Sequence, residues 1–206
     1  RAAVTSASGV PVTIKFRLGI DPDHLTYLES GRVAEEEGCA AVGLHARTAA
    51  DHYCGMAEWE AIGELKSRVR IPVLGNGDIW EAGDALRMMR QTQCDGVIVG
   101  RGCLGRPWLF RDLADVFDGC EPGDPPSFGT VLDTMFLHAR RLADWFGERQ
   151  AMVSFRRHTS WYTKGFSLNS ALRDRMMQVR TVDELENLFR DVDREQPFPI
   201  AGMRVK

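Results

Sequence analysis

Four short apolar segments recur in the first half of the chain, and each is followed by a stretch with helical character. They begin near residues 10, 40, 71 and 95. One of the intervening stretches, residues 58–69, places Trp59, Ile62 and Leu65 at the spacing of one buried helix face. Strands that alternate with helices in this way predict a parallel sheet in an α/β protein. Four such units amount to half of an eight-stranded βα barrel.

The third segment ends in a glycine-rich turn. Residues 71–79 read Ile-Pro-Val-Leu-Gly-Asn-Gly-Asp-Ile, so a short apolar strand runs directly into Gly75 and Gly77. Glycines allow a sharp turn and let backbone N–H groups approach a ligand closely. Taken alone, the turn favours an ordinary strand-to-helix connection, with Asp78 as the N-cap of a helix that begins near Trp80.

The fourth segment repeats this arrangement and adds a positive charge. Residues 95–102 read Asp-Gly-Val-Ile-Val-Gly-Arg-Gly. In βα barrels the loops after the last two strands commonly hold a phosphate through exposed N–H groups and a helix N-terminus. The two consecutive turns therefore predict an anion site, to which Arg101 would contribute a bidentate guanidinium.

The first two segments deliver polar side chains to their carboxyl ends. Residues 10–17 alternate apolar and polar, with Lys15 and Arg17 on one face, and residues 39–46 lead to His45 and Arg47. The alternation also fits a solvated face of an antiparallel sheet. A lone histidine at a strand end is more often structural, but His45 occupies the position that matches Lys15 in the previous unit, which favours a functional role.

Two connections between these segments lead to further expectations. Gly-Ile-Asp-Pro at residues 19–22 predicts a helix start with Asp21 as N-cap and Pro22 at the first helical position. Residues 48–56 form a long polar connection that either closes over a ligand or simply joins two elements. Cys54 in this connection is a poor candidate nucleophile, since no base is marked beside it.

Bulk composition excludes several classes of protein. No apolar run in the 206 residues approaches membrane-spanning length. The five cysteines show no Cys-x-x-Cys pair, no zinc spacing and no preceding secretory signal, which favours a reducing cytoplasm. A formal net charge of −3 does not by itself indicate a nucleic-acid binder, although an overall balance can hide a local basic surface.

The second half of the chain has a different organisation. Residues 119–126, Gly-Cys-Glu-Pro-Gly-Asp-Pro-Pro, predict a rigid linker between a first domain, 1–118, and a second domain, 127–206. Beyond the linker, residues 130–192 lack strand patterning and predict three or four helices. The sequence Thr-Val-Asp-Glu at 181–184 is typical of a capping box at the start of one of them.

Charge is distributed unevenly within this predicted helical domain. Residues 140–180 contain nine Lys or Arg against three Asp or Glu, whereas residues 181–196 contain two against six. Helical spacing would bring Arg157, Trp161 and Lys164 onto one stripe. A solvated helix face explains such a run, and so does a surface for structured RNA, where cations meet phosphates and rings meet unstacked bases. The residues alone do not separate these two readings.

Five segments in order resemble one family along nearly the whole chain. Together they resemble the bacterial tRNA-dihydrouridine synthases, most closely the B-type branch. The matching segments are Pro11-Val-Thr-Ile-Lys-Phe-Arg-Leu-Gly19, Leu44-His-Ala-Arg-Thr48, Pro72-Val-Leu-Gly-Asn-Gly-Asp-Ile79, Gly100-Arg-Gly-Cys-Leu-Gly-Arg-Pro-Trp108, and Phe155-Arg-Arg-His158 with Trp161-Tyr-Thr-Lys-Gly165.

The resemblance implies a fold, a reaction and a set of site residues. The fold would be the second half of a (β/α)8 TIM barrel, four βα units, followed by a small all-helical tRNA-binding domain. The reaction would be reduction of specific tRNA uridines to 5,6-dihydrouridine, with FMN as cofactor and NADPH as reductant. The implied FMN-binding residues are Lys15, His45, Asn76, Gly77, Asp78, Gly100 and Arg101. The implied tRNA-contacting residues are Arg47, Arg156, Arg157, His158 and Lys164, with Arg47 also a weaker candidate for FMN.

The resemblance also implies that part of the enzyme is missing. The cysteine that serves as catalytic acid in this family belongs to the half of the barrel that precedes these segments, and none of the five cysteines here matches it. We therefore expect a fragment that is inactive alone, taken from a cytoplasmic enzyme that is monomeric at full length and uses no metal. The alternatives are another FMN-dependent TIM-barrel oxidoreductase of the dihydroorotate dehydrogenase type and a non-catalytic RNA-binding remnant.

Overall fold

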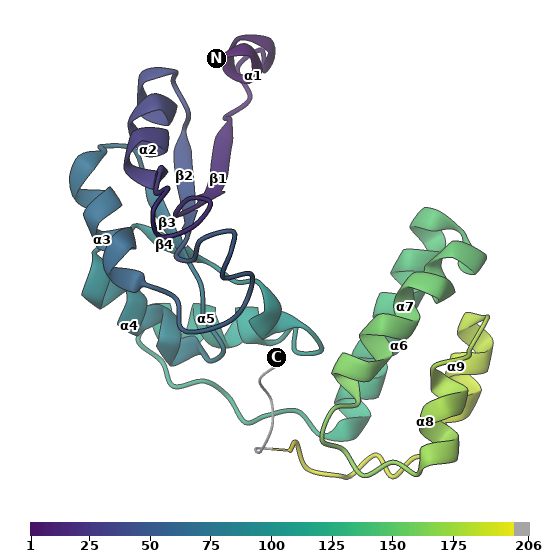
Figure 1. Cartoon of the computed structure of the whole chain (residues 1–206). Coiled ribbons are helices and arrows are strands. Elements are labelled where there is room, and N and C mark those ends of the chain that lie inside the picture. The colour runs from purple at the N-terminus through teal and green to yellow at the C-terminus, as the bar shows by residue number, and fades with distance from the viewer. Residues whose placement is uncertain (200–206) are drawn as a thin grey trace. The chain divides into compact units, whose positions relative to one another are not determined.

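The computed structural model describes residues 1–199, which divide into two compact units (Figure 1). The first unit consists of residues 1–102 and 109–122, and the second of residues 103–108 and the described residues from 123 onward. The division near residue 122 lies within the predicted linker, where residues 120–127 adopt no regular structure. The predicted second domain, 127–206, includes residues 200–206, which lie outside the described residues.

The first unit alternates strands and helices. In chain order it contains α1 (Ala2–Ser6), β1 (Thr13–Arg17), α2 (Tyr27–Glu36), β2 (Ala41–His45), α3 (Trp59–Arg68), β3 (Val73–Asn76), α4 (Ala82–Thr92), β4 (Gly96–Ile98) and α5 (Leu109–Phe117). A short 3-10 helix, η1 (Arg101–Cys103), follows β4. The four strands are parallel and lie in the order β1-β2-β3-β4. The predicted α/β fold with a parallel sheet is confirmed, and the arrangement agrees with part of a TIM barrel.

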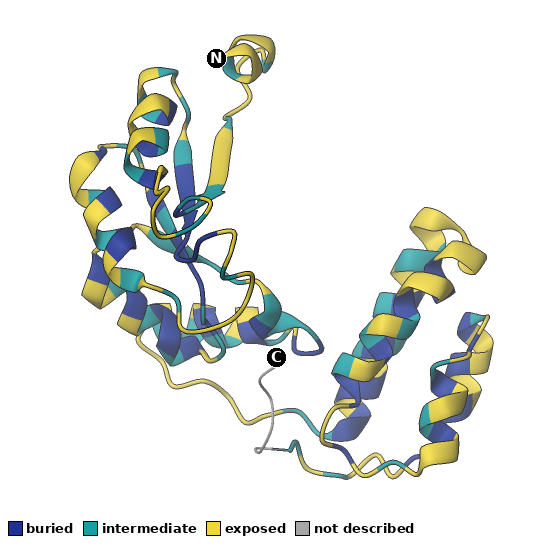
Figure 2. Cartoon of the chain, viewed as in Figure 1, coloured by how far each residue is buried: buried dark blue, intermediate teal, exposed yellow. Residues whose placement is uncertain are grey.

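Helices α2, α3 and α4 cover one face of this sheet (Figure 1). The side chains that meet there are apolar because successive strand residues alternate between faces, and this face lies against the helices. Val42, Leu44 and Val73 from the strands and Ile62 and Met88 from the helices are fully buried. Burial of each such side chain contributes about 1.5–3 kcal/mol. Figure 2 shows the contrast between buried β2 and exposed β1.

The predicted start of the first long helix is wrong. Helix α2 begins at Tyr27 after Thr26, not at Asp21. The Asp21 carboxylate instead accepts hydrogen bonds from the Asp23 N–H (3.0 Å) and from Nδ1 of His24 (2.7 Å). These bonds close a turn in which Gly19 pairs with Leu25. Asp is favourable in turns for the same reason that it caps helices, so the local pattern did not distinguish the two structures.

The predicted N-cap of α4 is also wrong. The cap is Glu81, which forms a reciprocal capping box with Asp84. Asp84 accepts N–H bonds from Trp80 and Glu81, each at 2.8 Å. Asp78 lies outside the helix in the left-handed region, with φ of 54°. Its carboxylate is engaged elsewhere, in the site described below.

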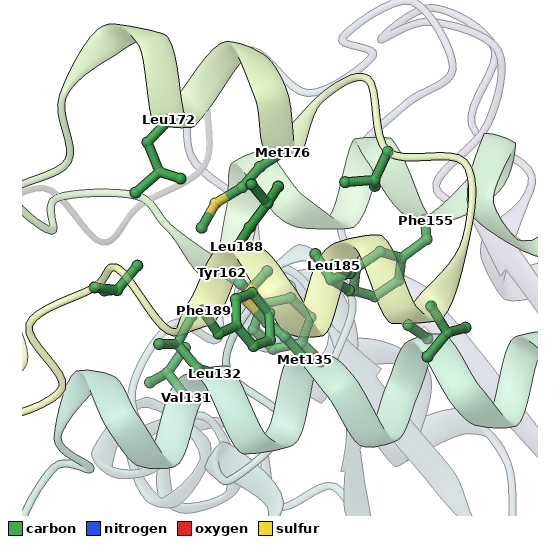
Figure 3. Close-up of a cluster of buried hydrophobic side chains, with 14 of the residues drawn as sticks. Val131, Leu132, Met135, Phe155, Tyr162, Leu172, Met176, Leu185, Leu188 and Phe189 are labelled. Carbon is green, nitrogen blue, oxygen red and sulfur yellow. The ribbon is translucent and has the colours of Figure 1, made fainter.

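Within the described residues, the second unit is helical. It contains α6 (Phe128–Phe146), α7 (Glu148–Tyr162), α8 (Ser170–Met176) and α9 (Val182–Phe189). Figure 3 shows side chains from all four helices converging on one core, among them Leu132, Phe155, Met176 and Leu185, each no more than 1 % exposed. None of the helices that the structure describes is long and apolar enough to cross a membrane.

Side-chain caps start three of these four helices. Ser127, Asn169 and Thr181 accept backbone N–H bonds from the residues three positions later. The predicted cap at Thr181 is thus confirmed, with Glu184 N–H donating to Oγ1 at 3.1 Å. The Glu184 side chain accepts the N–H of Arg180, one residue before the cap, at 2.7 Å, rather than the N–H of Thr181 that a capping box requires. Each such cap stabilises its helix by about 1 kcal/mol.

Candidate functional site

The carboxyl ends of the four strands lie in register across the sheet. Arg17 pairs with His45, His45 with Asn76, and Asn76 with Ile98. Because side chains at paired positions of a parallel sheet point to the same face, these residues form one row on the face opposite the helices. Arg17, His45 and Asn76, all named from the sequence, thus lie side by side. Lys15 lies one row earlier, paired with Gly43.

Gly43 makes room on this face. A Cβ atom at Gly43 would lie 2.6 Å from Cδ1 of Ile98 and 3.4 Å from Cγ of Lys15. The absence of a side chain therefore lets Lys15 lie across β2. Partial burial, followed by repulsion from Arg17, lowers the pKa of Lys15. Both effects disfavour the charged form of Lys15, and an anionic ligand beside it would offset them.

A cavity of about 190 Å³ opens at this end of the sheet. It brings together all seven residues predicted to bind the cofactor, together with Arg47. Its lining consists of Lys15, His45, Arg47, Tyr53, Asn76, Gly77, Asp78, Ile79, Trp80, Ile98, Gly100, Arg101 and Gly102. The volume is below the roughly 300–1,000 Å³ of typical ligand pockets, so these residues surround only part of a nucleotide-sized molecule.

His45 is held neutral in this cavity. The residue is 7 % exposed. Burial, reinforced by the positive charges of Arg17, Lys15, Arg47 and Arg101, lowers the pKa of His45 to about 4. At neutral pH the ring therefore has one N–H donor and one acceptor nitrogen. That state suits hydrogen bonding to a polar heterocycle without adding further positive charge.

Asn76 and two glycines shape the floor of the cavity. Nδ2 of Asn76 donates to the carbonyl of Ile98 at 2.7 Å, which fixes the side chain between β3 and β4. Gly77 has φ of +130°, a conformation that side chains rarely adopt. A Cβ at Gly100 would meet no atom within 4 Å. The backbone at Gly100 thus borders open space that a ligand group can enter.

Arg47 and Asp78 form an ion pair beside this floor. Nη2 of Arg47 lies 2.8 and 2.9 Å from the two carboxylate oxygens of Asp78. The Ala57 N–H also donates to Asp78, at 2.7 Å. Burial alone would raise the pKa of Asp78, but the hydrogen bonds from Arg47 and Ala57 outweigh it and lower the pKa. The Asp78 side chain is therefore an ionised partner of Arg47.

Arg101 is flanked by two aromatic rings that sequence reasoning did not select. Its Cζ lies 4.3 Å from the ring centroid of Tyr53 and 5.3 Å from that of Trp80. Trp80 follows the glycine-rich turn directly, so its position near the site follows from the motif. Tyr53 lies within the long connection 48–56, for which closure over a ligand was one of two expectations, but no sequence pattern singled out Tyr53 itself.

Four of the five residues predicted to contact tRNA lie in the second unit. The fifth, Arg47, lines the cavity in the first unit. Arg157 and Lys164 are exposed, whereas the guanidinium of Arg156 donates to the carbonyl of Val179 at 3.3 Å. His158 is half-buried, with its ring 5.0 Å from that of Trp161. The predicted helical stripe is wrong at one end, because α7 ends at Tyr162 and Lys164 lies beyond it.

The chain matches one known protein family. The family model described as dihydrouridine synthase (Dus) matches residues 2–196. A probable tRNA-dihydrouridine synthase of Mycobacterium tuberculosis H37Rv is 54 % identical over 201 residues, covering 96 % of this chain and 52 % of that protein. The tRNA-dihydrouridine synthase B of Xanthomonas axonopodis pv. citri is 37 % identical, covering 92 % and 57 %.

A third relative is less similar to this chain in sequence. The tRNA-dihydrouridine synthase B of Yersinia pestis is 34 % identical, covering 89 % of this chain and 57 % of that protein. The chain thus spans about half the length of the curated relatives it matches. Because the family model covers both units, from residue 2 to residue 196, this chain belongs to the dihydrouridine synthase family.

Proposed function

We propose that this chain supplies the flavin-phosphate half of the active site, and an RNA-docking unit, to an enzyme that reduces uridine to 5,6-dihydrouridine in tRNA. The observation that carries the proposal is the cavity at the strand ends, where Lys15, neutral His45 and Arg101 surround two glycine-rich turns. The names of the relatives, with which the chain is 34–54 % identical, support tRNA as the substrate.

The residues present fit FMN as the cofactor. Gly100 borders open space and Arg101 follows it, so backbone and guanidinium would bind the phosphate together. Lys15 would lie near the pyrimidine edge of the flavin, where a cation stabilises the negative charge of the reduced ring. Asn76 and Gly77 would line the ribityl chain. Asp78 would act through its backbone and through Arg47, because its carboxylate already pairs with that arginine.

Bound FMN, once reduced by NADPH, would supply the hydride for C6 of the uracil. The residues of this chain would bind and orient the ring, and His45, kept neutral, would offer an N–H or an acceptor nitrogen to it. A proton must also reach C5. None of the residues lining the cavity in the described part of the chain is a cysteine, so we assign no acid here.

The helical unit would bind folded tRNA. Arg157 and Lys164 are exposed and would contact phosphates, while Trp161 and His158 lie beside them as rings. The target uridine would have to leave its stack to reach a barrel cavity. We expect this activity in the cytoplasm, where tRNA is modified.

Two experiments test the proposal. Flavin fluorescence titration of the purified chain should show FMN binding that is weakened in Lys15→Ala and Arg101→Ala. In cells, deletion of the gene should remove dihydrouridine from a defined tRNA position, measured by mass spectrometry of nucleosides. Unchanged dihydrouridine after deletion would reject the enzymatic role. A chain that binds tRNA but never flavin would instead support the non-catalytic RNA-binding alternative.

A further inference from the structure

The connection between β2 and α3 is irregular, yet several charged side chains hold it. Nη1 of Arg17 donates to the carbonyls of Thr48 (2.8 Å) and His52 (3.0 Å). The Asp51 carboxylate accepts the N–H of Thr48 at 2.7 Å. Backbone carbonyls in a loop usually face water, so their capture by guanidinium groups indicates a loop held in one conformation.

Arg47 is the most buried of these groups. Its side chain is 2 % exposed. Nε donates to the Cys54 carbonyl at 3.1 Å, and Nη2 donates to the Gly55 carbonyl at 2.7 Å and to Asp78. Asp78 in turn accepts the N–H of Ala57. The ion pair thus joins Arg47, at the start of the loop, and residues 54–57, in its second half, to the turn after β3.

This arrangement is costly for stability. Nη1 of Arg47 is buried and has no hydrogen-bond partner in the described structure. Asp78 adopts the left-handed backbone conformation, which residues other than glycine rarely adopt, although Asp and Asn do so more readily than most. Removing a guanidinium and a carboxylate from water opposes folding unless all their donors and acceptors are satisfied. The pair is therefore better explained by the geometry that it imposes than by a gain in stability.

That geometry places Tyr53. Arginines hold the residues on either side of it: the His52 carbonyl accepts a bond from Arg17, and the Cys54 carbonyl accepts one from Arg47. Tyr53 is itself largely exposed, at 58 %. Its ring nevertheless lies over the guanidinium of Arg101, with 4.3 Å from Cζ to the centroid. The Arg17 guanidinium also lies 5.5 Å from the ring centroid. Because Tyr53 has little burial of its own, the position of its ring depends on the backbone that Arg17 and Arg47 hold.

We propose that Arg47 and Asp78 are positioning residues, which hold the 48–57 loop so that Tyr53 fixes the Arg101 guanidinium at the mouth of the cavity for the anionic group of a bound ligand. The identity of that ligand as FMN rests on the proposed function. The inference that Arg47 and Asp78 hold the loop does not depend on that function.

The experiment tests whether Arg47 and Asp78 hold the loop independently of which ligand binds. In hydrogen exchange measured by mass spectrometry on the full chain without ligand, Asp78→Asn should exchange loop amides 48–57 about tenfold faster. Asn retains the size of Asp and tolerates the left-handed conformation, so the fold should persist. The melting temperature should fall because buried Arg47 loses its counter-charge, but the faster exchange should be confined to the loop amides. Arg47→Lys should match it, because an ammonium group cannot reproduce the fork of bonds. Asp95→Asn, a carboxylate paired with Lys66, is the matched control and should leave loop exchange unchanged.

A double-mutant cycle then tests the route through Tyr53. FMN affinity, measured by fluorescence titration, should fall about threefold in Tyr53→Leu and in Asp78→Asn. The double variant should fall no further, since both changes remove one contact. Unchanged loop exchange in Asp78→Asn, or fully additive losses of affinity, would overturn the inference. If the wild-type chain fails to bind FMN, the proposed cofactor is rejected. The exchange data still show whether Arg47 and Asp78 hold the 48–57 loop.

Discussion

The guanidinium carbon of Arg101 lies 4.3 Å from the centroid of the Tyr53 ring. The two residues come from different strand–helix connections, and their contact joins the loop after β2 to the 3-10 helix after β4. A cation over an aromatic face contributes about 0.5–1 kcal/mol at an exposed site. This contact leaves the N–H groups of the guanidinium available for a phosphate. The contact therefore orients Arg101 without consuming its donors.

Replacing the Tyr53 ring should weaken binding of a phosphate-bearing ligand. Tyr53→Leu should lower FMN affinity about threefold, whereas Tyr53→Phe should retain most of it because the ring face remains. Isothermal titration at low ionic strength provides the measurement. Equal losses for Leu and Phe would show that the hydroxyl, not the ring, is what matters.

The neutral state of His45 should make stability pH-dependent. Its pKa is lowered to about 4 from the ordinary 6.5, so the unfolded chain binds the proton more tightly than the folded chain. The stabilising contribution is complete above pH 6.5 and should be lost as the pH falls through 4. Urea unfolding at several pH values should show this slope, reduced in His45→Gln. An NMR titration midpoint near 6.5 would contradict the assignment.

Gly102 should be intolerant of any side chain. A Cβ at this position would lie 2.1 Å from the backbone oxygen of Ile79, which a rotamer change cannot relieve. We expect Gly102→Ala to cost about 2 kcal/mol or more. Gly100→Ala is the matched control, since its Cβ would meet no atom within 4 Å, and it should change stability by less than about 1 kcal/mol. Thermal unfolding of both variants decides the point.

Neighbouring arginines on α7 should have separable roles. Arg157 is exposed, so Arg157→Ala should lower tRNA affinity. The slope of log affinity against log salt concentration should become shallower by about one, because one phosphate contact is lost. Arg156 donates to the Val179 carbonyl, so Arg156→Ala should mainly lower the melting temperature. Filter binding at several salt concentrations, alongside thermal melts, measures both effects. A larger loss of tRNA binding in Arg156→Ala than in Arg157→Ala would reverse these roles.

Local patterns predicted the elements of the fold well. Strand and helix spacing is read from a few consecutive residues, which is why the helix over 59–68 and the cap at Thr181 were found. Helix starts failed at Asp21 and Asp78, because an Asp can cap a helix, close a turn or accept an ion pair. Those outcomes differ in which donors reach the carboxylate: near neighbours in the chain for Asp21, and the distant Arg47 and Ala57 for Asp78.

The sequence by itself determined which residues meet at the strand ends, because parallel pairing of short strands in chain order aligns Arg17, His45 and Asn76 whatever the loops do. Only the tertiary structure decided what those residues contact. It buried Arg47 against Asp78, turned Arg156 toward Val179 and brought Tyr53 over Arg101. Such contacts depend on loop paths set by long-range hydrogen bonds and charge pairing, and no local periodicity encodes them.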